Sequence, residues 1–188
     1  TPDWYDENAE KYEHDFRDKA ASWMKRNIIN ICGQPCTKLK EENGLIYFHV
    51  CNSLFYSSFG QDNDYRHSKI RDVLRESDFA KALKDTYGDA VVPVKVDLTS
   101  LDGLKDYGYL NEDVLSLMDI DLYRECRTNV FKGDNWWWLA TPDSTDSGYG
   151  AFGVRFVRSD GALSCDLCGG DGDEVRPFFI LKSSILKS

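Results

Sequence analysis

Between Trp4 and Ile31, apolar residues recur at steps of three and four positions. This spacing places them on one face of a helix, so it predicts one long amphipathic helix, ended by Gly33 and Pro35. We therefore assign residues 1–35 to an N-terminal helix. Its charged face is either a solvated surface or the flank of a coiled coil through which copies of the chain associate. The apolar positions are Tyr5, Ala9, Tyr12, Phe16, Ala20, Trp23, Met24, Ile28 and Ile31.

Two further helices are predicted in the middle of the chain. Residues 67–84 have a helical apolar stripe, with Ser68 as a capping residue and a break near Ser77. A second helix is expected to open at Asn111 and to run through Tyr123, with acidic residues near its positive end. The stripe of the first helix consists of Ile70, Val73, Leu74, Phe79, Ala82 and Leu83.

The strand signals lie in two places along the chain. Residues 44–50 are rich in β-forming side chains and predict a buried strand. Residues 91–98 predict extended chain, in which Pro93 favours the edge of a sheet. The C-terminal third adds a hairpin and a last strand, so the fold class is α+β with a β-rich C-terminal third. These C-terminal elements are the strands at 151–157, 162–167 and 175–181, with a turn at 159–161.

Residues 143–173 contain no Lys, Glu, Gln, Met or Trp, although the other 157 residues contain 31 residues of these five types. Glycine- and aspartate-rich β-turns avoid these types and are one explanation. The other is genetic, because randomising the adenines of an AAC or AAT codon cannot produce any of the five. The gap is therefore typical of a segment varied by a diversity-generating retroelement.

The motifs on either side of this gap resemble the bacterial domain of unknown function DUF6273. That family has a WWLRSP pattern, a variable stretch containing a turn glycine, and then GVRP followed by apolar residues. In this chain Ala140-Thr141 replaces the Arg-Ser pair, and Glu174 replaces the glycine before VRP. The resemblance covers residues 44–182, and the matching positions are Trp137, Trp138, Leu139, Pro142, Gly161, Val175, Arg176 and Pro177.

The resemblance implies a C-type-lectin-like domain over residues 36–188, similar to the variable proteins of diversity-generating retroelements. A diversified surface needs a fixed frame beneath it, which we assign to Trp137, Trp138, Arg176 and Pro177. Neighbouring side chains on a strand alternate between faces, so at least one residue of the tryptophan run at 136–138 should be exposed. We expect Arg176 to be structural, because its guanidinium can satisfy a buried carboxylate.

The same resemblance implies a ligand-binding protein, not an enzyme, with its contact residues inside residues 143–173. Its ligand would be a protein or a surface group with a basic or polar patch, since the segment is acidic. The alternatives are an undiversified cell-surface or carbohydrate-binding module and, third, an oxidase of the formylglycine-generating type. We call the proposed ligand-contacting residues the contact set: Asp146, Ser147, Tyr149, Phe152, Ser164, Asp166, Leu167, Asp171 and Asp173.

Charge and hydropathy restrict the partners. The formal charge of -9 and the pI near 4.8 argue against nucleic acid, which is bound by basic faces. No stretch is long and apolar enough to span a bilayer, and no secretion signal opens the sequence. The expected location is a cell surface or a phage particle, with any leader or anchor outside the given sequence.

The cysteines and acidic turns raise three weaker possibilities. Cys32, Cys36, Cys165 and Cys168 could form a four-thiolate zinc site, or the last two alone a redox pair, although incidental thiols are the expectation. Calcium is a further possibility, because lectin-like folds bind it with acidic loops. Its candidate ligands are Asp171, Asp173 and Glu174, and otherwise no cofactor is expected.

Overall fold

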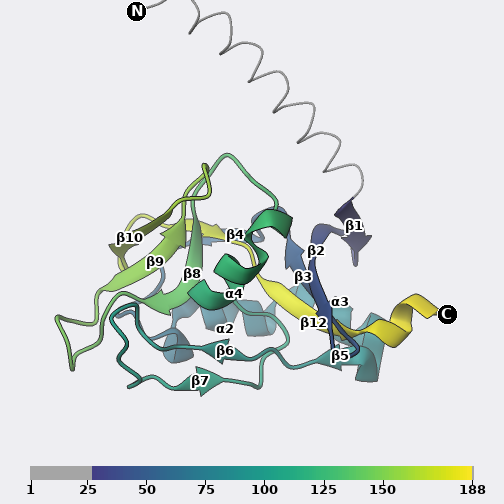
Figure 1. The fold of residues 1–188 in the computed structure, drawn as a ribbon, viewed down its shortest axis with the longest axis horizontal. Helices are drawn as coiled ribbons and strands as arrows, with labels where there is room; N and C mark the ends of the chain where they lie inside the picture. Colours follow the sequence, from purple (N-terminus) through teal and green to yellow (C-terminus); the bar gives the residue numbers. More distant parts are fainter. Residues whose placement is uncertain (1–26, 188) are drawn as a thin grey trace, which may run out of the picture.

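The computed structural model describes residues 27–187 as a mixed α+β protein built on two five-stranded sheets (Figure 1). This confirms the predicted α+β class. The part of the predicted N-terminal helix before residue 27 lies outside the described residues. The described α-helices are α2 (Lys69–Glu76), α3 (Asp78–Tyr87) and α4 (Ile120–Cys126). The strands are β1 (Ile28–Ile31), β2 (Gln34–Glu42), β3 (Leu45–Val50), β4 (Phe55–Ser57), β5 (Val91–Val92), β6 (Val96–Asp97), β7 (Tyr109–Leu110), β8 (Trp137–Pro142), β9 (Gly153–Val157), β10 (Leu163–Leu167), β11 (Asp173–Val175) and β12 (Phe178–Lys182).

The first sheet has the order β1-β2-β3-β12-β5, so its last strand in sequence lies between two earlier ones. The prediction that the N-terminal helix reaches Ile31 is wrong, because Ile28–Ile31 pairs with β2 in a hairpin. Isoleucines favour a strand where a partner is available, and the positive φ of Cys32 and Gly33 forms the turn. The strand predicted at residues 44–50 is confirmed as β3, and β5 lies at the sheet edge as Pro93 indicated.

Helices α2 and α3 confirm the predicted helix with a break. The Ser68 hydroxyl caps α2, and the Ser77 hydroxyl ends that helix and caps the next. Phe79 of α3 packs edge-on against Phe179 of β12, with ring centroids 5.6 Å apart, so α3 contacts the core next to the first sheet. Val73 was wrongly placed in the core-facing stripe and is exposed, because the other apolar residues already occupy the buried side of this short helix.

The helix predicted over residues 111–123 is wrong for most of its length. Asn111 does not open a helix, and Asp113, expected in the first turn, is instead buried and accepts a hydrogen bond from Arg71 Nε at 2.7 Å. The following backbone pairs with β12, where Ser116 and Phe178 exchange two hydrogen bonds of 3.2 and 2.8 Å. Only α4 at the end of the predicted range is helical. Partners distant in the sequence therefore override the local helix signal.

The second sheet has the order β10-β9-β8-β11-β4. Its β9–β10 hairpin and the turn at residues 159–161 agree with the prediction. The single strand predicted over residues 175–181 is wrong: Val175 ends β11 in this sheet, whereas Phe178 begins β12 in the first sheet. Arg176 and Pro177 connect the sheets, and proline cannot donate the hydrogen bond that a continuous strand would need. Within residues 27–187, no helix has the length and apolarity for crossing a membrane.

Candidate ligand-binding surface

The tryptophan run at residues 136–138 begins β8 between the two sheets. Trp137 and Trp138 are buried, whereas Trp136 is 45% exposed, so the prediction of at least one exposed ring is confirmed. Both inner rings are buried because each face of β8 is covered. Trp137 packs against His49 and Tyr123, with ring centroids 5.0 and 5.7 Å away.

The other face of β8 holds the second buried ring. Trp138 packs edge-on against Phe59 at 5.7 Å, and its Nε1–H donates to the Ser57 carbonyl at 2.8 Å. The exposed Trp136 stacks on the buried Phe156, with centroids 5.0 Å apart. One tryptophan therefore remains at the surface while the next two fill the interior.

Arg176 and Glu174 form a buried ion pair where the chain passes from one sheet to the other. The Arg176 Nε donates to Glu174 Oε2 at 2.6 Å, and Pro177 is buried beside it. The other Glu174 oxygen accepts from Tyr56 Oη at 3.1 Å and Asn135 Nδ2 at 2.9 Å. The carboxylate that replaces the family glycine is thus fully hydrogen-bonded, and its residue lies within a strand.

The loop between β8 and β9 is held by polar groups that are themselves buried. Asn63 Nδ2 donates to the Ser144 carbonyl at 2.8 Å, which fixes the start of the loop. The Ser144 and Thr145 hydroxyls donate to Asp102 and Asp106 at 2.7 and 2.5 Å. Hydrogen bonds from the Ser100 and Ser144 hydroxyls lower the pKa of Asp102, and the hydrogen bond from Thr145 lowers the pKa of Asp106. The loop is therefore fixed by residues next to, and not within, its exposed tip.

The contact set lies at the surface, and none of its nine residues is buried. Three of them are partly buried, namely Ser164, Asp166 and Asp173. The other six are exposed: Asp146, Ser147, Tyr149, Phe152, Leu167 and Asp171. The frame residues, in contrast, are all buried: Trp137, Trp138, Arg176 and Pro177.

The β9–β10 hairpin divides the contact set between two faces. Ser164 lies opposite the buried Phe156, and the next residue, Cys165, lies opposite Arg155. Directly paired residues of antiparallel strands point to the same side, and successive residues alternate. The set is therefore not one continuous patch. The face towards Trp136 carries Ser164 and Asp166, and the opposite face carries Cys165 and Leu167.

The face opposite Trp136 has a small polar network of its own. Arg155 Nη1 forms an ion pair with Asp143 Oδ1 at 2.9 Å, and Tyr149 Oη donates to Asp143 Oδ2 at 2.8 Å. The latter hydrogen bond raises the pKa of Tyr149 to about 12, so this phenol stays protonated at neutral pH. Tyr149 is nevertheless 59% exposed, which leaves its ring available for contact.

No family model, curated protein or solved structure matched this chain. The DUF6273 resemblance and the C-type-lectin-like fold therefore stay predictions. A function for this protein is therefore argued from the arrangement of the described residues.

The six cysteines are free thiols, and the two proposed zinc pairs lie in different sheets. Cys32 and Cys36 belong to the β1–β2 hairpin, whereas Cys165 and Cys168 lie in and just after β10. Burial raises the pKa of the Cys165 and Cys168 thiols, which disfavours the reactive thiolate form. Within residues 27–187, no three His, Cys, Asp or Glu side chains are grouped as metal ligands.

The candidate calcium residues have separate environments in the structure. Asp171 is exposed in the loop before β11, and Asp173 is partly buried. Glu174 is committed to Arg176 through the buried ion pair. A cation at this place would therefore have to compete with the arginine for one of the three carboxylates.

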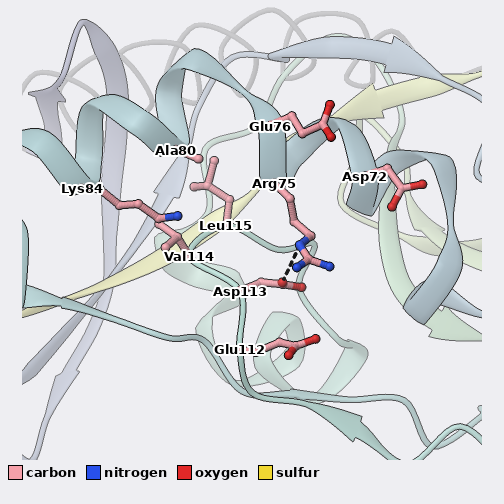
Figure 2. Close-up of a pocket in the computed structure, with 9 residues that line it drawn as sticks. All are labelled: Asp72, Arg75, Glu76, Ala80, Lys84, Glu112, Asp113, Val114 and Leu115. Atoms are coloured by element: carbon pink, nitrogen blue, oxygen red, sulfur yellow. Dashed lines mark ion pairs between the residues drawn. The ribbon is translucent and has the colours of Figure 1, made fainter.

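A hollow of about 380 Å³ lies between α2, α3 and residues 112–115 (Figure 2). Arg75 and Lys84 reach it from the two helices, and the Arg75 Nε lies 3.5 Å from Asp113 Oδ1. Its buried acid, Asp113, is also bound by Arg71. This hollow combines both signs of charge, and its buried carboxylate is already neutralised. Sequence analysis did not find it, because its parts are about forty residues apart.

A second hollow that the sequence did not indicate lies where β8 and β11 begin. Its lining includes Tyr56, Asn135, Trp136 and Asp173, and its volume is about 220 Å³. Tyr56 is 63% exposed, the largest exposed fraction of an aromatic side chain given for the described residues. The available signal was the tryptophan run at residues 136–138, because alternation along a strand required at least one of its three rings to be exposed.

Proposed function

We propose that this protein is a non-enzymatic ligand-binding protein with a C-type-lectin-like domain, and that residues 143–173 form its diversified contact surface. The observation that carries this proposal is the contrast in burial between the contact set and the frame residues that flank it in the sequence. None of the nine contact-set residues is buried, whereas all four frame residues are. Such a separation lets side chains change at the surface without changing what stabilises the fold.

The backbone of the segment supports this proposal because few of its supports depend on the contact set. The loop is fixed by Asn63 and by the buried hydroxyls of Ser144 and Thr145. The β9–β10 hairpin is held by main-chain hydrogen bonds, and these can form whatever most of the side chains are. Gly161, with φ of 83°, makes the hairpin turn. The contact set can therefore vary on a backbone that is held from elsewhere.

The segment also contains buried residues, and these set a limit on diversification. Val154, Phe156, Val157 and Cys168 belong to the core. The proposal therefore predicts that variants of this segment differ at the contact set but keep apolar residues at these four positions. The absence of Lys, Glu, Gln, Met and Trp from this segment does not by itself distinguish the contact set from these core residues.

The exposed side chains favour a protein or another large surface ligand. Tyr149, Phe152 and Leu167 are each at least half exposed and offer rigid or compact apolar area. Exposed aspartates beside them offer adaptable polar contacts, as antibody loops do with tyrosine and small polar residues. Exposed apolar groups of this kind in a monomer mark interaction sites.

The proposal is tested by replacing the six exposed contact residues together and measuring the free energy of unfolding in urea. The variant combines Asp146→Ser, Ser147→Asn, Tyr149→Asn, Phe152→Ser, Leu167→Thr and Asp171→Ser. Because exposed substitutions each change stability by roughly 0.5 kcal/mol or less, we expect a total change of about 1 kcal/mol. A loss of several kcal/mol would place these side chains in the folded core and contradict the proposal.

The matched control is Phe156→Ala in the same hairpin, which should lower the free energy of unfolding by about 3–5 kcal/mol because the ring is buried.

A second test determines the DNA sequence around the gene that encodes this protein. A template copy of residues 143–173 that carries Asn codons at contact-set positions would support diversification. A locus without any such copy would favour the undiversified alternative.

A further inference from the structure

The hollow between Tyr56 and Trp136 has two aromatic walls that are held in place. Trp136 stacks on Phe156 with the ring planes 19° apart, so one of its faces is fixed against the protein. Tyr56 donates its hydroxyl to Glu174 at 3.1 Å, which fixes the second ring. Both rings remain largely exposed. They are therefore positioned for a ligand and do not need to be ordered by it.

The carboxylates that line this hollow are not equivalent. Glu174 is neutralised by Arg176, and both of its oxygens accept hydrogen bonds. Asp173 has no such partner: its Oδ2 is shielded from solvent and receives no hydrogen bond. Burial, together with the negative charges of Asp166 and Glu174, raises the pKa of Asp173 to about 6. An unpaired acceptor of this kind is costly unless a donor binds it.

The chemistry of the hollow points to a cation that can donate hydrogen bonds. Among the described residues lining it, three are acidic (Asp134, Asp173 and Glu174) and none is Lys or Arg. Aromatic faces attract ammonium and guanidinium groups through their ring quadrupoles. A volume of about 220 Å³ can admit the end of one long side chain. A neutral sugar hydroxyl could also donate to Asp173, but it would leave the negative charge of the hollow uncompensated.

We propose that this hollow binds a lysine or arginine side chain of a protein ligand, with the charged group between Asp173 and the ring of Trp136, which the register places on the same face of the second sheet. The inference deepens the proposed function, because Asp166 and Asp173 belong to the contact set. It also divides the site into two parts. Tyr56, Trp136, Asp134 and Glu174 lie outside residues 143–173 and are constant, whereas Asp166 and Asp173 lie inside this segment and are open to variation.

The experiment uses the whole chain and short peptides as probes. The acetylated and amidated peptide Gly-Gly-Arg-Gly-Gly is titrated while the indole N–H signal of Trp136 is followed by NMR, assigned through Trp136→Phe. The control peptide carries citrulline, which has nearly the same shape without the charge. We expect the arginine peptide to bind at least tenfold more tightly, and Asp173→Asn to weaken its binding about tenfold.

Asp171→Asn is the matched control variant, because it removes the same charge from an exposed residue of the same loop. It should change the affinity less than twofold at an ionic strength of about 0.15 M, where distant surface charges are screened. Trp136→Leu should weaken binding about threefold or more if the ring contributes. Equal binding of the citrulline peptide, or equal effects of Asp171→Asn and Asp173→Asn, would overturn the proposal.

Two other probes test whether the hollow binds a carbohydrate or a free polyamine in place of a protein side chain. An oligosaccharide that moves the same indole signal more strongly than the arginine peptide would overturn the proposal in favour of a carbohydrate site. Free spermidine that binds while lysine and arginine peptides do not would also overturn it. A tolerant contact set combined with no peptide binding would leave the proposed function intact and remove only this cation site.

Discussion

The frame residues flank the contact set in the sequence, but the two groups differ in the contacts and hydrogen bonds that their side chains make. In the frame, Arg176 is paired with Glu174, whose remaining oxygen is also hydrogen-bonded, and both inner tryptophans are packed on their faces. In the contact set, Asp173 carries a shielded oxygen without a partner. Stability is therefore concentrated in the frame, whereas the contact set contains a carboxylate oxygen that no donor of the protein satisfies.

The largest effect should come from removing a frame ring. We expect Trp138→Ala to lower the free energy of unfolding by about 3–5 kcal/mol, because it leaves a large cavity beside Phe59 and Phe156. The control is Trp136→Ala, which removes the same side chain from the surface and should cost about 1 kcal/mol. Urea denaturation of both variants measures the contrast. Equal costs would show that the frame and the surface do not differ.

The buried ion pair provides the next test. Arg176→Met should cost about 3–4 kcal/mol, because it leaves Glu174 buried without its partner. Adding Glu174→Gln should recover part of that loss, since the second change removes the uncompensated charge. Arg158→Met is the control, because its ion pair with Asp160 at 3.6 Å is exposed and contributes little. A double variant as unstable as Arg176→Met would contradict the pairing argument.

Acid should destabilise the frame through His49, which is buried against Trp137. Burial and the Arg176 charge lower the pKa of His49 from 6.5 to about 3. Between these values the unfolded chain binds more protons than the folded one, so stability falls as the pH falls from 6.5 towards 3. This residue alone should remove roughly 3 kcal/mol between pH 7 and pH 4.

The pH series is measured by urea denaturation of the parent chain and of His49→Gln. The variant should lose less stability on acidification, because it has no imidazole to protonate. His67→Asn controls for an exposed histidine, whose ion pair with Asp62 raises its pKa. Parallel acid slopes of the parent and His49→Gln would show that His49 does not bring about the acid sensitivity.

The smallest effect is a gain in stability at the contact set. Burial, Asp166 and Glu174 raise the pKa of Asp173 from 3.8 to about 6. The folded state therefore binds this proton more tightly, and its contribution to stability is lost as the pH rises through 6. Asp173→Asn should raise the stability at pH 7 by about 1 kcal/mol, discounted for solvent screening, with no gain at pH 4.

Calorimetry at the two pH values measures this gain, and Asp171→Asn serves as the exposed control. A stabilising Asp173→Asn that also loses binding of the arginine peptide would show stability and function opposed at one residue. A destabilising effect at pH 7 would mean that the Asp173 carboxylate is satisfied in the folded protein, and would weaken the contrast drawn above.

Local signals predicted the elements whose partners are close in sequence. The serines at 68 and 77 indicated two caps, and the Ser159-Asp160-Gly161 turn indicated the β9–β10 hairpin. The failures lie where a distant partner decides. Asp113 binds Arg71 and does not lie in the first turn of a helix, and Ile28 pairs across a hairpin and does not continue a helix.

The candidate site shows the same limit. Exposure of the contact set followed from composition and strand alternation, and Asp166 and Leu167 had to point to opposite faces as neighbours on one strand. The hollow between Tyr56 and Trp136 did not follow, because the two rings are eighty residues apart in sequence and meet only through β11. The pattern of apolar and polar residues along the chain does not reveal that β11 lies between β8 and β4.

The position of β11 and β12 has a consequence for quality control during synthesis. β12 lies between β3 and β5, and β11 lies between β8 and β4, so each sheet is completed only by residues after 172. A chain that ends within or soon after residues 143–173 because of a shifted reading frame lacks both strands. It leaves unpaired edges in both sheets, and such edges are sites of aggregation and degradation. Correct pairing of both sheets therefore depends on the reading frame being kept through residues 143–173.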